Sequence, residues 1–168
     1  MTDTTFPTVR SISAGTTMSS PLRHLIATDA STASLILRVA LALVIFPHGA
    51  QKVLGWFGGY GFEGTLGYFT GTLGVPALLA LLVFAAELLG PIGLLVGAFS
   101  RVAAAGLVAV MTGAVFIAHL PYGFFMNWSG AQGGEGYEYH LLVIGMSLAL
   151  LVAGSGRWSF DRWLSSKL

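Results

Sequence analysis

The sequence contains no cysteine, and only 9% of its 168 residues are charged. Without cysteine, the chain has no disulfides, no thiolate metal ligands and no thiol redox chemistry. The net charge is only +1 and the sequence has no cluster of basic residues, which argues against nucleic acid as a partner. In contrast, 55% of the residues are hydrophobic and the mean hydropathy is +0.79. A soluble core of this size cannot hide so much apolar surface, so we expect the lipid bilayer to be the solvent.

Four apolar runs cover residues 33–54, 75–99, 102–120 and 140–156. A spanning helix needs roughly 17–25 residues, so the fourth run is at the lower limit. Ser100 and Arg101 leave only a tight turn between the second and third runs, which therefore form an antiparallel hairpin. The fold class that we predict is an all-α membrane protein, with a four-helix transmembrane bundle and a short C-terminal interfacial helix.

The polar ends divide the chain into three parts. Residues 1–31 form a polar flexible tail with a short interfacial helix near residues 21–29, and they lack the apolar core of a signal peptide. Residues 32–156 form the four-span domain, and residues 157–168 form an amphipathic segment. With four spans, one side of the membrane carries Arg10, Arg23, Arg101, Arg157, Arg162 and Lys167, and the other carries only Lys52. The positive-inside rule then predicts a multi-pass inner (plasma) membrane protein with both termini cytoplasmic.

Ionisable residues inside the spans are the main functional signal, because charges in a bilayer are usually paired or functional. Arg38, His48 and Lys52 fall on one face of the first span, within about 80° at 100° per residue. Counting by helix rise puts Glu87 about 18 Å deep, near the midplane. Arg38 either snorkels to the cytoplasmic interface or pairs with Glu87 across the bundle. Glu87 serves as a structural partner or a proton relay, and Lys52 marks the rim, where it could fix an anionic substrate or a lipid headgroup.

Three histidines from three different spans, His48, His119 and His140, fall in the same outer layer. None has the HxxxH or ExxH spacing typical of a metal site on one helix, so we expect no metal. Either they exchange protons with a quinone, which suits their near-neutral pKa, or they are ordinary interfacial residues. The candidate catalytic residues are therefore His48, His119, His140 and Glu87, and the structural polar residues are Arg38, Glu87 and Lys52.

The two outer loops, residues 55–74 and 121–139, are both rich in glycine and aromatic residues. They form either interfacial belts or lids that fold over a pocket for a flat apolar ligand. In the second case, the candidate ring-binding residues are Trp56, Phe57, Tyr60, Phe124, Trp128 and Tyr139.

Over about residues 34–164 these motifs resemble the DoxX-like integral membrane proteins (DoxX/DoxD superfamily). The likeness rests on R-x9-HG-x2-K in the first span and on E-x2-G with a turn arginine in the second. It also rests on the stretches IAHLPYGFF and GGEGYEYHLLVIGMSLALLVAGSGRWSFDRWL. The resemblance implies a small four-helix membrane protein. Many members of this family are named as oxidoreductases, one branch is a subunit of a thiosulfate:quinone oxidoreductase, and others are linked to membrane oxidoreductase assemblies.

Residues and resemblance together predict an inner-membrane oxidoreductase, or its membrane subunit, that binds a quinone in an outer-leaflet pocket. No covalent cofactor is expected. One alternative is a non-catalytic scaffold that docks soluble redox proteins through residues 157–168 on the cytoplasmic face. The other is a small transporter, which would need a homo-oligomer because four short spans leave little room for a pore.

Overall fold

The computed structural model describes residues 21–167, and every regular element in this range is helical. The predicted flexible tail lies largely outside the described residues, and only its last part, with the expected short helix, is seen. The elements are α1 (Pro21–Ile26), α2 (Thr32–Leu54), η1 (Trp56–Gly58), α3 (Gly61–Gly67), η2 (Tyr68–Thr72), α4 (Ala77–Val96), α5 (Ser100–Ala114), η3 (Val115–His119), η4 (Leu120–Tyr122), α6 (Glu138–Ala153) and α7 (Phe160–Ser165).

The four long helices lie where the apolar runs predict them. α2, α4 and the continuous stretch from α5 through η4 are long and apolar enough to cross a membrane, and α6 is a shorter apolar helix of 16 residues. α2 and α4 end at Gly55 and Gly97, which adopt the left-handed conformation that favours glycine at a helix end. The all-α, four-helix prediction is therefore confirmed.

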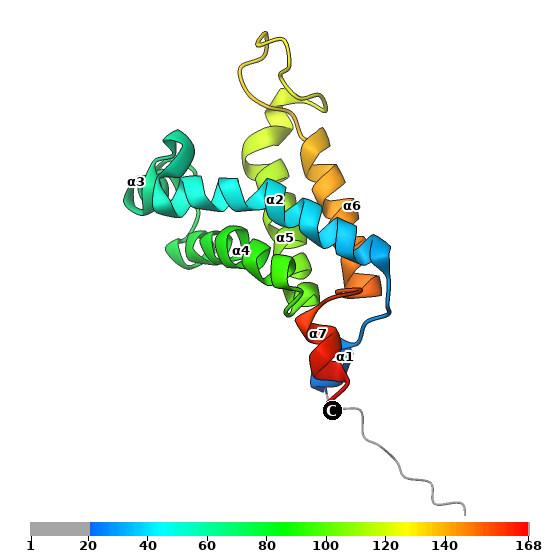
Figure 1. The fold of residues 1–168 in the computed structure, drawn as a ribbon. Helices are drawn as coiled ribbons and strands as arrows, with labels where there is room; N and C mark the ends of the chain where they lie inside the picture. Colours follow the sequence, from blue (N-terminus) through cyan, green and yellow to red (C-terminus); the bar gives the residue numbers. More distant parts are fainter. Residues whose placement is uncertain (1–20, 168) are drawn as a thin grey trace, which may run out of the picture.

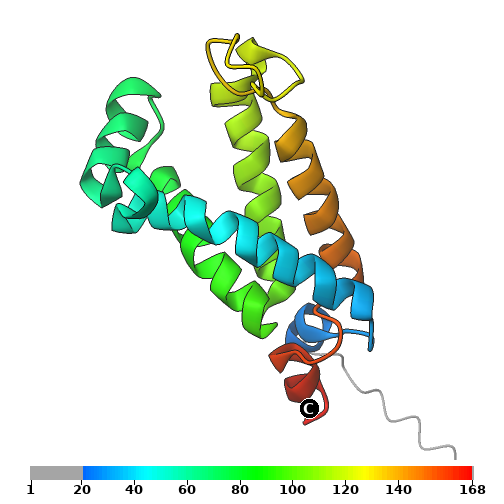
Figure 2. The ribbon, with the colours of Figure 1, turned by 45° about the horizontal axis from the view of Figure 1, so that its top comes forward.

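α2 packs against α4 and α5 packs against α6, which gives two antiparallel pairs (Figures 1 and 2). The pairs meet at the end where α1, α7 and the turn of residues 97–99 lie, which we name the closed end. They diverge like a V toward α3 and the loop of residues 123–137, which we name the open end (Figure 2). Where the pairs meet, the core includes Leu41, Leu94, Leu107 and Leu150.

The first outer segment, which the sequence predicts as a loop, is largely helical. It contains η1, α3 and η2, and it flanks the first turns of α4. The rings of Phe62 and Phe69 pack against Phe84 of α4, with centroid distances of 5.5 and 5.8 Å. These aromatic contacts fasten the segment to the bundle, whereas residues 123–137 remain mostly irregular.

Arg38 is the centre of the closed end, where its side chain is only 1% exposed. Both interpretations of Arg38, snorkelling and a link to Glu87, are wrong. All its hydrogen bonds, of 2.6–3.1 Å, go to backbone carbonyl oxygens, those of Leu94, Leu95, Ser155, Arg157 and Trp158. Leu94 and Leu95 lie in the last turn of α4, where carbonyls lack helical partners and carry partial negative charge, and the other three carbonyls lie in the chain after α6. A guanidinium with five donors satisfies both groups.

Asp161 completes this arrangement from the C-terminal segment, and it is also 1% exposed. Its carboxylate accepts hydrogen bonds from the backbone N–H groups of Phe99 (2.7 Å) and Ser100 (3.1 Å) and from the Ser155 hydroxyl. Its own N–H donates to the carbonyl of Gly97. A carboxylate at the start of α5 satisfies the free N–H groups there. The C-terminal segment therefore holds α4 and α5 together and is more than an interfacial helix.

Arg101 also donates hydrogen bonds to backbone carbonyl oxygens, and in this way it links α5 to α6 and α1. It donates to the carbonyls of Leu151 (2.8 Å) and Val152 (2.9 Å) in the last turn of α6. It also donates to the carbonyls of His24 and Ala27, each at 2.6 Å, and so fixes α1 against the bundle.

We expect Arg38→Met to lower the free energy of unfolding by roughly 3–5 kcal/mol, because it leaves the carbonyl oxygens of the closed end without their donors. Thermal or denaturant unfolding in detergent measures this loss. Arg162→Met, which removes an exposed cation at the same end, is the matched control and should change little. Equal effects of the two substitutions would contradict the role of Arg38.

Candidate functional site

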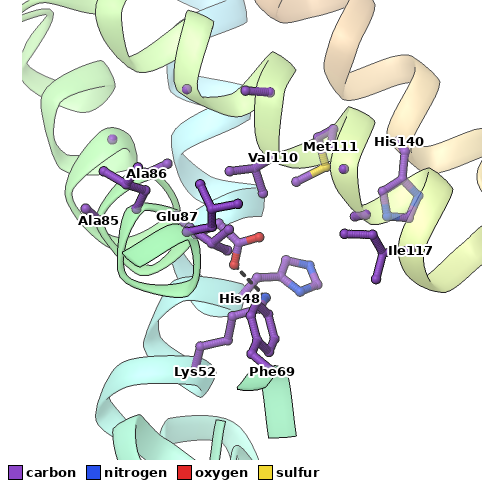
Figure 3. A pocket seen from close by; sticks show the side chains of 18 of the residues that line it. His48, Lys52, Phe69, Ala85, Ala86, Glu87, Val110, Met111, Ile117 and His140 are labelled. Carbon is purple, nitrogen blue, oxygen red and sulfur yellow. Dashed lines mark ion pairs between the residues drawn. The ribbon is translucent and has the colours of Figure 1, made fainter. Parts of the chain in front are cut away.

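A cavity of about 1040 Å³ lies between the diverging helix pairs and continues along α4 and α5 (Figure 3). All four long helices or their extensions contribute to its wall. The predicted polar residues His48, Lys52, Glu87, His119, Tyr139 and His140 line it together. Arg38 does not, because it lies in the closed end.

Glu87 pairs with Lys52 rather than with Arg38. The Lys52 Nζ lies 2.5 Å from the Glu87 Oε2, and the two side chains are 25% and 5% exposed. In Figure 3 the His48 ring stands beside this pair. Lys52 is therefore not a free cation at the rim.

Gly49 explains why Glu87 meets Lys52. A Cβ at Gly49 would overlap the backbone of Glu87, so α2 crosses α4 at this point with almost no gap. The first turns of α4 extend past this crossing beside α3 and η2. Counting depth from helix ends therefore misplaced Glu87, which lies level with His48 and Lys52 and not at a separate depth.

The three histidines converge in a row that also includes Tyr139. The ring centroids are 6.0 Å apart for His48 and Tyr139, 5.5 Å for Tyr139 and His140, and 4.1 Å for His140 and His119. His48 is exposed and His140 is buried, so the row runs from an accessible ring to an enclosed one. Within residues 21–167, no group of three or more His, Cys, Asp or Glu side chains could hold a metal ion.

Hydrogen bonding distinguishes the rings of this row. The His119 Nδ1 lies 2.9 Å from the Glu135 carbonyl oxygen. Because a carbonyl only accepts, His119 Nδ1 carries the proton. In contrast, the His140 Nδ1 and the Tyr139 hydroxyl are buried and have no hydrogen-bond partner among the described residues. Buried polar atoms are nearly always paired, so these two atoms are candidate contacts for a ligand in the cavity.

Most of the predicted ring-binding residues lie away from this cavity, and that expectation is wrong for them. Trp56, Phe57 and Tyr60 do not line it and are exposed. Phe124 and Trp128 line a separate cavity of about 340 Å³, and of the six candidates Tyr139 alone borders both cavities.

Other residues of the same two outer segments line the cavity instead: Tyr68, Phe69 and Met126. The first two lie in η2, a helical turn that a loop prediction could not orient. Met126 is positioned by the Glu138 carboxylate, which accepts its N–H at 2.9 Å. Nearby, the Glu135 carboxylate accepts the N–H of Asn127 at 2.6 Å.

Comparison with known proteins identifies relatives of this chain. The family described as DoxX matches residues 33–120. A protein of Bacillus subtilis (strain 168) named "Putative oxidoreductase CatD" is 29% identical over 117 residues, which cover 70% of this chain and 77% of that protein. No solved structure matches the chain.

We expect Lys52→Met to destabilise the protein by roughly 3 kcal/mol, because it leaves the buried Glu87 carboxylate without its partner, and Glu87→Gln to cost less, because the Lys52 side chain is 25% exposed. The double variant should lose less than the sum, with a coupling free energy of about 1–3 kcal/mol in a double-mutant cycle. Unfolding in detergent provides the four free energies.

The exposed residues Glu63 and Lys167 provide the control cycle, with Glu63→Gln and Lys167→Met. Their effects should add to within about 0.5 kcal/mol. If the effects of Lys52→Met and Glu87→Gln add equally well, the two groups are not coupled.

Proposed function

Because this chain belongs to the DoxX family of membrane proteins, we propose that it is an oxidoreductase, or the membrane subunit of one, that binds a quinone in the cavity. The observation that carries this proposal is the pair of unpartnered buried atoms, the His140 Nδ1 and the Tyr139 hydroxyl, in a largely apolar cavity. A quinone has a flat apolar ring and two carbonyl oxygens, which match apolar walls and a few hydrogen-bonding groups. The name of the Bacillus relative is in keeping with this chemistry.

The two unpartnered atoms are not exposed on the cavity surface, so in this proposal side chains move aside to let the ligand reach them. Tyr139 can donate its hydroxyl proton to a quinone carbonyl. His140 Nδ1 can do the same in the tautomer that carries the proton there. His119 is held by the Glu135 carbonyl, which fixes its ring beside His140.

Reduction of a quinone to a quinol takes up two electrons and two protons. In this proposal Tyr139 and His140 deliver the two protons to the two carbonyl oxygens, and His119 positions the His140 ring. The exposed His48 takes up replacement protons at the open end, and the adjacent Lys52–Glu87 pair keeps two opposite charges together beside it. The electrons come from a partner protein that carries a redox cofactor.

The cations also lead us to propose an orientation in the inner membrane. Besides the buried Arg38, the described cations at or near the closed end are Arg23, Arg101, Arg157, Arg162 and Lys167. By the positive-inside rule the closed end then faces the cytoplasm and both termini are cytoplasmic. The cavity lies toward the outer leaflet, and an electron donor that reaches the quinone directly binds at the open end.

We expect purified protein to bind a quinone, and Tyr139→Phe to weaken binding by about tenfold, because the substitution removes one hydrogen bond to the ligand. Quenching of tryptophan fluorescence in a quinone titration measures the dissociation constant. Tyr60→Phe is the matched control, since Tyr60 is 85% exposed and lies outside the cavity. The proposal fails if wild-type protein binds no quinone, or if both substitutions have the same effect.

A further inference from the structure

We propose that the ligand carries a long apolar tail, which enters from the bilayer between α4 and α5 and lies along these two helices. This inference rests on the proposed function, because it adds a tail site to the ring site. It also narrows the substrate class to amphiphiles with a polar head and a long hydrocarbon chain.

The cavity is much longer than the polar row. Along α5 it extends from His119 back to Val102, which is about 25 Å at 1.5 Å per residue. Toward the closed end its wall has no polar side chain and consists of residues such as Leu89, Gly90, Gly93, Val102, Ala103 and Gly106. We name this apolar part of the cavity the apolar limb. A quinone ring at the row of histidines and Tyr139 would leave it unfilled.

The apolar limb opens sideways to the bilayer. Leu89 of α4 and Val102 of α5 line this part of the cavity, and they are also 62% and 52% exposed. On membrane-spanning helices, exposed apolar side chains face lipid. The cavity wall is therefore continuous with the lipid-facing surface, so a hydrocarbon chain can pass from the bilayer to the polar row without crossing water.

Small residues create the space for the limb. A Cβ at Gly106 would lie 3.4 Å from the Ala86 Cβ, and a Cβ at Gly90 would lie 3.8 Å from the Ala103 Cβ. α4 and α5 thus touch through glycine and alanine, as helices in membranes often do.

A hydrocarbon chain is the occupant that suits the groove of the apolar limb. The apolar walls of the groove can make dispersion contacts but no hydrogen bonds, so water does not bind there. If the groove stayed empty, its wall atoms would lack dispersion partners. The chain could come from the isoprenoid tail of a quinone or from the acyl chain of a phospholipid. We commit to the quinone tail, because the groove belongs to the same cavity that Tyr139 and His140 line, and the unpartnered atoms of these two residues lie just behind that wall.

Gly113 and Gly145 provide a matched pair of substitutions. A Cβ at either position meets nothing within 4 Å. Gly113 lines the cavity and Gly145 does not. Both lie inside helices, where leucine is about 1 kcal/mol more favourable than glycine, so both leucine variants should fold.

The experiment titrates wild type, Gly113→Leu and Gly145→Leu in nanodiscs with a tailless quinone and with the same ring bearing an isoprenoid tail. We expect Gly113→Leu to weaken binding of the tailed quinone by about tenfold or more, because its side chain occupies the groove. Binding of the tailless quinone should be unchanged, and Gly145→Leu should alter neither. A photoreactive group on the tail should label residues 79–113.

The outcomes separate this inference from the proposed function. If the tailless ring binds wild type but Gly113→Leu affects both quinones equally, or the tail labels no residue of α4 or α5, the tail site is wrong and the ring site stands. If neither quinone binds wild type, the proposed function fails as well. If a phospholipid with a photoreactive acyl chain labels residues 79–113 and the tailed quinone does not compete, the occupant is lipid and the inference is overturned.

Discussion

The structure depends on the way Arg38 binds backbone carbonyl oxygens at the closed end. A cation enclosed among spanning helices is costly unless its donors are all satisfied, and here five carbonyls satisfy them. These carbonyls belong to the end of α4 and to the chain after α6, and the cation links both to α2. Asp161 then joins the turn between α4 and α5 to the same cluster. With one end fastened in this way, the helix pairs can diverge at the other end and still form one bundle.

The buried charges are thus divided between two tasks. Arg38 and Asp161 hold the closed end, whereas Lys52 and Glu87 neutralise each other in the cavity wall. Gly49 makes the second pair possible, because only a residue without a side chain lets α2 approach α4 so closely. The structural role of Asp161 also affects how one can test the alternative that residues 157–168 dock soluble redox proteins. Deleting residues 157–168 would remove Asp161 along with any docking surface, so loss of a partner after that deletion would not show where the partner binds.

Hydrophobic runs and turn residues were enough to predict the four helices, the hairpin at Ser100 and the shared outer layer of the histidines. The partners of Arg38 could not be predicted, because backbone carbonyls have no signature in a sequence. Glu87 was misplaced for a different reason, since counting along a helix assumes that all helices begin at the same level. Most of the aromatic residues predicted to bind a ligand ring do not line the main cavity, because the prediction used the composition of the loops and had no information on which way each side chain points. Trp56 and Phe69 look alike in a glycine-rich segment, and only the helical turn at η2 directs Phe69 to the cavity.

The proposed function needs separate routes for the ligand and for protons, and the divergence of the helix pairs supplies both. In this proposal the ligand enters sideways between α4 and α5, through a wall that contains leucine, glycine and alanine and offers no path for a proton. Protons would enter along the bundle axis at the exposed His48 and move toward the buried His140 by way of Tyr139. The ring centroids on this route are 6.0 and 5.5 Å apart, so ring movements or a bridging water would complete each step. Since the Lys52–Glu87 pair stands beside the first step, separating these two charges would disturb proton entry before it disturbed the ligand's own contacts.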